Sequence, residues 1–258
     1  LLAFGLAGCP GLDAPLGAVP LEQGYALVVA VLEAFLDLAT PTQTRMRHLA
    51  VDNLLARLNL PLLSVDGLKR QPSGDLLHLG TYPQRQKDLF YVAAVAPLGR
   101  LDSSMLKGAA QLASEFGDGT LRFTPWQGVL LPNLKNHGAV TEGLEQLGFL
   151  GSVDQPLARM IACTGSSGCA KGLADTKADA LQLAALQPGA EVHLSGCPRS
   201  CAAAHTAPVT LLAVSPGHYD VYFREAAHPG FGRLHARTLS IEAAGALLRG
   251  RTRSNTDD

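Results

Sequence analysis

The chain has 258 residues with a formal net charge of −1, and 47% of its residues are hydrophobic. This charge excludes the basic surface of a nucleic-acid-binding protein, and an aromatic share of only 5% removes the stacking platforms that single-strand binders use. The length and the hydrophobic content favour one large domain or two ordinary ones, with a core that needs no disulfide staples.

The first part of the chain is predicted to be helical. Apolar residues recur at helical spacing over residues 21–58, with a break at Pro41, and a linker is expected over 59–63. Because the sequence begins at Leu1 and not at Met, we expect the natural N-terminus to lie upstream. Residues 1–60 are then the helical tail of a preceding region that is mostly absent from this sequence.

No membrane segment or anchor is expected. The apolar stretch over 25–38 is too short to cross a bilayer and carries Glu33 and Asp37. Cys9 follows small residues, as a lipid-modified cysteine does, but no basic region precedes it. We therefore expect a soluble, cytoplasmic protein.

The region over residues 61–135 alternates between short strands and one amphipathic helix. The expected elements are a strand at 90–95, a helix over 101–116 that ends at Gly117, and strands at 120–124 and 129–131. Asp102, Ser103 and Ser104 are the candidate N-caps of this helix. The order strand, helix, strand, strand is typical of a ferredoxin-like α+β unit.

The region over residues 136–258 alternates again. The expected elements are a helix at 144–147, a strand at 160–162, a helix at 175–186, a strand at 191–194, a hairpin over 209–214 and 219–223, and a final helix from Ser240. Two of these strands, those ending at 162 and 194, precede loops that contain cysteines. Because loops at the carboxyl ends of neighbouring strands converge, we expect the two loops to meet.

These loops carry four of the five cysteines. Cys163 and Cys169 lie in ACTGSSGCAKG, and Cys197 and Cys201 lie in HLSGCPRSC. Thiolates are soft ligands, and small neighbours allow the backbone to approach closely, which is what an iron–sulfur cluster needs. The sequence therefore predicts that these four residues bind a cluster and that Cys9 plays no part.

Three other uses of the cysteines remain open. Structural zinc sites usually have two to four residues between paired cysteines, and the first pair here has five. Disulfide frameworks belong to short secreted chains. Buried cysteines that act as small hydrophobes are expected in apolar periodic runs, and not in loops rich in glycine and serine.

The two cysteine motifs resemble those of the sulfite and nitrite reductase superfamily, whose second half carries C-x5-C and C-x3-C around a 4Fe-4S cluster next to a tetrapyrrole. Within the superfamily the chain resembles the precorrin-3B synthases over residues 66–214. The stretches that carry this resemblance are DGLKRQPSGDLLHLGTYP, VAAVAPLGRLDSSMLKGAAQLA, LRFTPWQGVLLP, ACTGSSGCAKGLADTKADA and HLSGCPRSCAAAHTAPVTLLA.

The resemblance implies an α+β fold. A ferredoxin-like sulfite/nitrite reductase half-domain over 61–135 precedes a mixed-sheet domain of the 4Fe-4S and sirohaem type over 136–258, and residues 1–60 belong to a preceding half. The motif FTPWQG has Gln127 where many relatives have a basic residue.

The implied activity is that of an oxidoreductase, a monooxygenase of aerobic cobalamin biosynthesis. Such an enzyme converts precorrin-3A to precorrin-3B by oxygen-dependent ring hydroxylation and lactone formation. The implied cofactors are the 4Fe-4S cluster and a non-haem iron that activates oxygen. The implied partners are the tetrapyrrole substrate precorrin-3A and an electron donor, either an NADH-linked reductase or a ferredoxin.

Two alternatives stand beside this interpretation. One is a sirohaem-dependent sulfite or nitrite reductase, of which this sequence is a fragment. The other is a binding module without catalysis, stabilised by zinc or by a cluster.

A tetrapyrrole with many carboxylates calls for cations at the rim of its pocket. Lys171 and Arg199 lie inside the cysteine loops, and Arg122 lies in the preceding domain, so these three are the predicted substrate-binding residues. Arg70 and Arg85 are weaker candidates. The alternative for each is an ordinary solvated surface charge.

Two histidines and the single tryptophan are the remaining candidates. His193 and His205 flank the second cysteine pair, and an imidazole suits iron, but a local hydrogen-bonding role is the more common one. Trp126 is expected to pack in the core under the sheet, with macrocycle stacking as the minor alternative. No catalytic residue is predicted.

Overall fold

The computed structural model describes residues 1–6, 15–66, 68, 77–203, 207–225, 227–228 and 230–254. The predictions for Cys9, Arg70 and His205 lie outside these residues. The chain divides into two compact units, Leu1–Ser73 and Gly74–Asp258, and each is described by itself. The boundaries expected at residues 60 and 135 stay predictions.

The first unit consists of a short hairpin and helices. Its elements are β1 (Leu2–Phe4), β2 (Gly17–Val19), η1 (Leu21–Gln23), α1 (Gly24–Leu38), η2 (Met46–His48) and α2 (Val51–Arg57). Val19, Leu27 and Leu54 are at most 2% exposed and form its core. The predicted helices are confirmed. The hairpin was not predicted, because strands of three residues are too short to show an alternating pattern.

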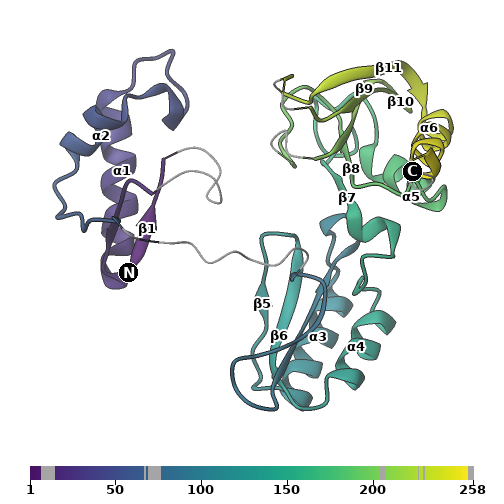
Figure 1. Ribbon diagram of the computed structural model, residues 1–258, viewed down its shortest axis with the longest axis horizontal. Coiled ribbons are helices and arrows are strands. Elements are labelled where there is room, and N and C mark those ends of the chain that lie inside the picture. Colours follow the sequence, from purple (N-terminus) through teal and green to yellow (C-terminus); the bar gives the residue numbers. More distant parts are fainter. Residues whose placement is uncertain are drawn as a thin grey trace. The chain divides into compact units, whose positions relative to one another are not determined.

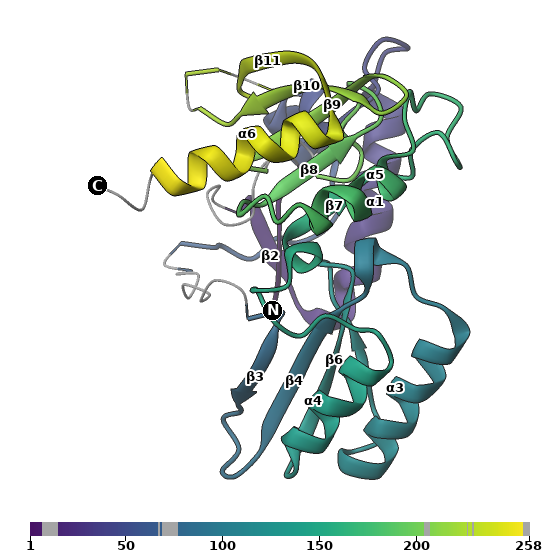
Figure 2. The ribbon, with the colours of Figure 1, turned by 90° about the vertical axis from the view of Figure 1, so that its right-hand side faces the viewer.

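A four-stranded sheet opens the second unit. Its strands are β3 (Gly80–Pro83), β4 (Phe90–Val95), β5 (Arg122–Phe123) and β6 (Gly128–Leu134). The strand order is β3-β4-β6-β5, and all neighbours are antiparallel. Helices α3 (Ser103–Phe116) and α4 (His137–Gln146) pack against each other and against this sheet, as Figure 1 and Figure 2 show.

Capping residues in the local sequence explain where the two helices that pack on this sheet begin. The Asp102 side chain accepts hydrogen bonds from the backbone N–H groups of Ser104 and Met105, so it caps α3 as predicted. A helix was predicted at 144–147, and its predicted first residue is wrong, because α4 begins at His137. Two glycines in α4 weaken the helical signal, while Asn136 caps it by accepting from Ala139.

A five-stranded mixed sheet completes the unit. Its strands are β7 (Met160–Ala162), β8 (Val192–Ser195), β9 (Val209–Ser215), β10 (His218–Phe223) and β11 (Arg233–Ser240). The order is β11-β10-β9-β8-β7; β7, β8 and β9 are parallel, and β9, β10 and β11 are antiparallel. Helices α5 (Thr176–Ala185) and α6 (Ile241–Ser254) contribute residues to its core. The α+β class is confirmed.

Strand β11 was not predicted. Its sequence RLHARTLS is rich in polar residues, and several of them are exposed at the edge of the sheet. An edge strand of this kind lacks the apolar run by which a buried strand is recognised.

The two sheets meet at a short helix, η3 (Pro97–Gly99), which directly follows strand β4. Leu98 in this helix is 5% exposed, and its side chain belongs to the core of the five-stranded sheet. A second short helix, η4 (Pro156–Arg159), contacts η3. In the described part of the chain, no helix is both long and apolar enough to cross a membrane.

A candidate thiol site at the ends of two parallel strands

Parallel strands bring the two cysteine loops together. Cys163 directly follows β7, and Cys197 comes two residues after β8. The two strands pair in parallel register, with Ala162 opposite Leu194. Both loops therefore lie at the same end of the sheet, where β7 and β8 end, as the sequence pattern predicts.

Hydrogen bonds join the two loops. The backbone N–H of Gly196 donates to the Sγ of Cys163 at 3.1 Å, and the N–H of Leu173 donates to the carbonyl of Gly196 at 2.9 Å. A hydrogen bond donated to sulfur stabilises negative charge on it, which favours a thiolate ligand.

Two glycines of these loops lie in tight packing, Gly172 against its own loop and Gly196 against the other one. A Cβ added to Gly172 would lie 2.6 Å from the carbonyl carbon of Gly165. A Cβ added to Gly196 would lie 3.2 Å from the Cα of Gly172 and 3.3 Å from the Sγ of Cys163. The small residues of the motifs are therefore a requirement of this packing.

All four predicted ligands are free thiols. Cys163 and Cys197 are partly buried, and Cys169 and Cys201 are exposed. Within the described residues, no three His, Cys, Asp or Glu side chains are grouped so that they could hold a metal ion. A four-iron cluster distributes its four thiolates over several irons, so it needs a wider arrangement than a single ion does. Four soft donors on two adjoining loops fit such a cluster.

A cavity of about 300 Å³ lies beside these loops. It opens between the two sheets of the second unit, and Ala202, the residue after Cys201, lines it. The rest of its wall is mainly apolar, with a few polar groups, and is contributed by His78, Val95, Ala96, Leu98, Gly99, Pro125, Trp126, Gln127, Leu157, Ala158, Arg159, Met160, Ile161, Glu191, Val192, Ala207 and Pro208. A cavity of this composition is typical of a site for a small organic ligand.

An aromatic pair forms part of the wall. The rings of His78 and Trp126 stack with their centroids 4.8 Å apart and an interplanar angle of 12°. Burial lowers the pKa of His78, and the carboxylate of Glu191 partly opposes this effect. Trp126 is 59% exposed, so the prediction that it packs in the core is wrong. The reason is that Trp126 lies in the turn between β5 and β6, which borders the cavity, so an aromatic face stays accessible.

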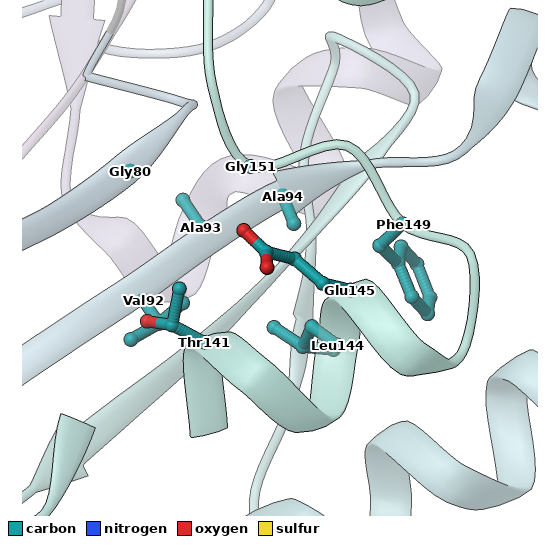
Figure 3. Close-up of a pocket in the computed structure, with 9 residues that line it drawn as sticks. All are labelled: Gly80, Val92, Ala93, Ala94, Thr141, Leu144, Glu145, Phe149 and Gly151. Carbon is teal, nitrogen blue, oxygen red and sulfur yellow. The ribbon is translucent and has the colours of Figure 1, made fainter. Parts of the chain in front are cut away.

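A second cavity is too small for a substrate. It lies between β4 and α4 and measures about 10 Å³, which is about the space of one water molecule. Figure 3 shows the side chains of Thr141, Leu144 and Glu145 reaching from α4 toward the strand that carries Val92, Ala93 and Ala94. This space belongs to the packing of the antiparallel sheet.

The predicted substrate-binding cations lie at different places. Lys171 and Arg199 are exposed on the two cysteine loops. Arg122 is exposed on β5, the edge strand of the antiparallel sheet, and Arg85 is exposed near the end of β3. His193 is fully buried in β8. The roles of all these residues stay predictions.

Sequence reasoning missed two cations. Arg159 lines the cavity and donates to the carbonyl of Gly189 at 3.1 Å. Lys177 lies in the first turn of α5, and its ammonium donates to the carbonyl of Leu98. A signal was available for Lys177, because it follows an Asp-Thr pair that starts a helix just beyond the first cysteine loop.

The fold and the site define a class: an α+β protein in which a ferredoxin-like sheet adjoins a mixed sheet with paired thiol loops. Residues 82–146 match the family model described as the nitrite/sulfite reductase ferredoxin-like half domain. Residues 82–146 of the second unit are therefore similar to this half domain.

Similar proteins bear the names of these reductases. The chain is 32% identical over 246 residues to ferredoxin–nitrite reductase of Zea mays, a match that covers 81% of this chain and 42% of that protein. It is 28% identical to sulfite reductase [ferredoxin] 2 of Mycolicibacterium paratuberculosis, over 80% of this chain and 42% of the relative. The chain thus spans about two fifths of the length of these relatives.

A solved structure shares the fold. The structure of the Mycobacterium tuberculosis NirA protein superimposes with a TM-score of 0.71 at 22% identity, over 92% of this chain and 50% of that one. At this identity the likeness concerns the fold alone.

These names correct one prediction. The expectation of a precorrin-3B synthase that converts precorrin-3A is wrong, since the relatives are named nitrite and sulfite reductases. The oxygen-activating iron stays a prediction. The cysteine motifs, which carried the resemblance, are those expected of the superfamily as a whole. The segments that flank them did not distinguish one substrate from another.

Proposed function

We propose that this chain forms the cluster-binding part of a sirohaem-dependent nitrite or sulfite reductase, an oxidoreductase that takes electrons from ferredoxin. Cys163, Cys169, Cys197 and Cys201 would bind a 4Fe-4S cluster. The observation that carries this proposal is the hydrogen bond from Gly196 to the sulfur of Cys163, because it joins the two thiol loops.

The cavity supports the second cofactor. Its wall is mainly apolar and includes the exposed face of Trp126, which suits the face of a macrocycle. Ala202, the neighbour of Cys201 in the chain, lines the cavity, so a ligand there would lie close to the second thiol pair. The cluster and the sirohaem would together supply electrons to a bound oxyanion.

Residues of this chain would also bind the macrocycle and exclude water from it. Lys171 and Arg199 stand on the cysteine loops, where a guanidinium or an ammonium can pair with peripheral carboxylates of the macrocycle. The apolar wall excludes water from the face of the macrocycle. The choice of ferredoxin as donor follows the printed names of the relatives, in which ferredoxin is the partner of both the nitrite and the sulfite enzymes.

The single tryptophan allows a direct test of the cavity. Trp126 lines it and is the only tryptophan in the chain, so a tetrapyrrole that enters should quench the fluorescence. Sirohaem would be titrated anaerobically into the chain reconstituted with iron and sulfide, with Trp126→Phe as the background control. We expect saturable quenching together with cluster and sirohaem absorption bands. A chain that takes up no sirohaem, or takes it up with unchanged fluorescence, would contradict the proposed site.

A further inference from the structure

Helix α5 begins at the point where the two sheets meet. Lys177, its second residue, donates from Nζ to the carbonyl oxygen of Leu98. Leu98 follows the antiparallel sheet in the chain, but its side chain is buried in the core of the mixed sheet. Its φ of 51° lies in the left-handed region, which residues other than glycine rarely adopt. The Lys177 ammonium therefore holds an uncommon backbone turn at the junction.

The preceding residue holds the first ligand loop. Thr176 is fully buried, and its hydroxyl donates to the carbonyl of Cys163 at 2.8 Å. The same oxygen lies 3.6 Å from the Sγ of Cys163. Two consecutive side chains of α5 thus connect the Cys163 loop with the junction of the sheets.

Two neighbouring groups, Arg100 and Cys163, act on the pKa of Lys177 in opposite directions. Partial burial and the guanidinium of Arg100, which follows η3, lower the pKa of Lys177, whereas Cys163 raises it. Lys177 is anchored to Leu98 and directly follows Thr176, which hydrogen-bonds the carbonyl of Cys163, so its side chain is held next to the first ligand loop. A cluster that accepts an electron gains one negative charge, and its potential depends on the net charge and the hydrogen bonds around it.

We propose that Lys177 is a positioning residue that fixes the junction at Leu98 against the Cys163 loop and stabilises the reduced cluster with its positive charge. This inference rests on the proposed cluster. A cluster held by these cysteines would accept one electron from a one-electron donor and would thereby gain one negative charge. Lys177 raises the reduction potential because it favours the more negative product.

Three variants separate charge from structure. Lys177→Met keeps an unbranched side chain and removes the charge, and Lys177→Arg keeps the charge. Arg249→Met is the matched control, because Arg249 donates to the carbonyl of Leu186 at 2.8 Å at the opposite end of α5. It removes the same kind of contact, a cation on a backbone carbonyl, away from the cysteines.

The measurement is the midpoint potential of the cluster in the whole chain, reconstituted anaerobically and titrated with dithionite while the reduced form is followed by electron paramagnetic resonance. We expect Lys177→Met to retain iron and to shift the reduction equilibrium about tenfold toward the oxidised form, which is about 59 mV for one electron. Lys177→Arg and Arg249→Met should keep the potential of the unmodified chain. If Lys177→Met does not hold iron, Lys177→Gln, which can still donate to Leu98, should show the same shift.

The outcomes distinguish this inference from the proposed function. A chain that holds a cluster, with an unchanged potential in Lys177→Met, would overturn the role of Lys177 alone. An equal shift in Arg249→Met would also overturn it, since the effect would then be one of surface charge. A chain that takes up no cluster would overturn both proposals.

Discussion

The two sheets of the second unit differ in strand direction, and both cysteine loops belong to the sheet that contains parallel strands. All neighbouring strands of the four-stranded sheet are antiparallel, and the segments that follow β4 and β5 border the cavity but carry no cysteine. In the five-stranded sheet β7, β8 and β9 run parallel, so the loops after β7 and β8 leave from one edge. The cysteines lie in those two loops. The antiparallel sheet contributes packing and one wall of the cavity.

The comparison predicts that serine in place of each of Cys163, Cys169, Cys197 and Cys201 has the largest effect. Serine offers a harder oxygen ligand, so each substitution should lower bound iron sharply. The measurement is the iron content after anaerobic reconstitution. Cys9→Ser should bind as much iron as the unmodified chain. Full iron content in all four variants would refute the ligand set.

The packing of the first cysteine loop can be broken without changing a ligand. In Gly172→Ala the new Cβ would lie 2.6 Å from the carbonyl carbon of Gly165 in the same loop, so this loop must rearrange. We expect less bound iron and a loss of about 1–3 kcal/mol in the free energy of unfolding. Gly151→Ala is the control, because a Cβ there meets no atom within 4 Å. Equal iron content in both variants would show that iron binding does not depend on this packing within the first loop.

The junction of the sheets is tested by Leu98→Ala. This side chain is 5% exposed and packs in the core of the mixed sheet, so its truncation should cost about 2–5 kcal/mol of unfolding free energy. Leu101→Ala, at a position that is 37% exposed, should cost much less. Urea denaturation measures both. Similar values for the two variants would mean that Leu98 does not connect the sheets.

The smallest effect is expected in the antiparallel sheet. Hydrogen bonds from Ser104 and Met105 lower the pKa of Asp102, the cap of α3. A carboxylate with a lowered folded pKa stabilises the protein above its unfolded value of about 3.9, and this contribution is lost as the pH falls through the folded value. Asp102→Ala should therefore lower the melting temperature at pH 7, and the difference should shrink progressively as the pH falls below about 4.

Two controls sharpen this last prediction. Asp102→Asn keeps a capping oxygen without the charge, so it should retain most of the stability at pH 7 and show less dependence on pH. Bound iron should be unchanged in both variants, because α3 lies in the sheet without cysteines. A loss of iron in Asp102→Ala would contradict the division of roles between the two sheets.

Much of this fold is predictable from the sequence. Strand 90–95 and helix α3 follow from apolar periodicity, a capping aspartate and a terminal glycine. The meeting of the cysteine loops follows from the strands that precede them. Elements without a strong pattern were missed: β3 is four residues long, and β11 is polar at an edge.

The site was less predictable, because its important contacts use backbone atoms. The hydrogen bond between Gly196 and Cys163, and that between Lys177 and Leu98, join residues 33 and 79 positions apart. No local pattern encodes such pairs. Trp126 was assigned to the core because large aromatics are usually buried, and only the tertiary structure shows that it borders a cavity.

The most direct test of the central claim is the ratio of iron and acid-labile sulfide to protein in the unmodified chain, reconstituted anaerobically. A 4Fe-4S cluster predicts about four irons and four sulfides per chain, and an electron paramagnetic resonance signal after reduction by one electron. A colourless chain that binds zinc without sulfide would contradict the account, as would a chain that binds no metal.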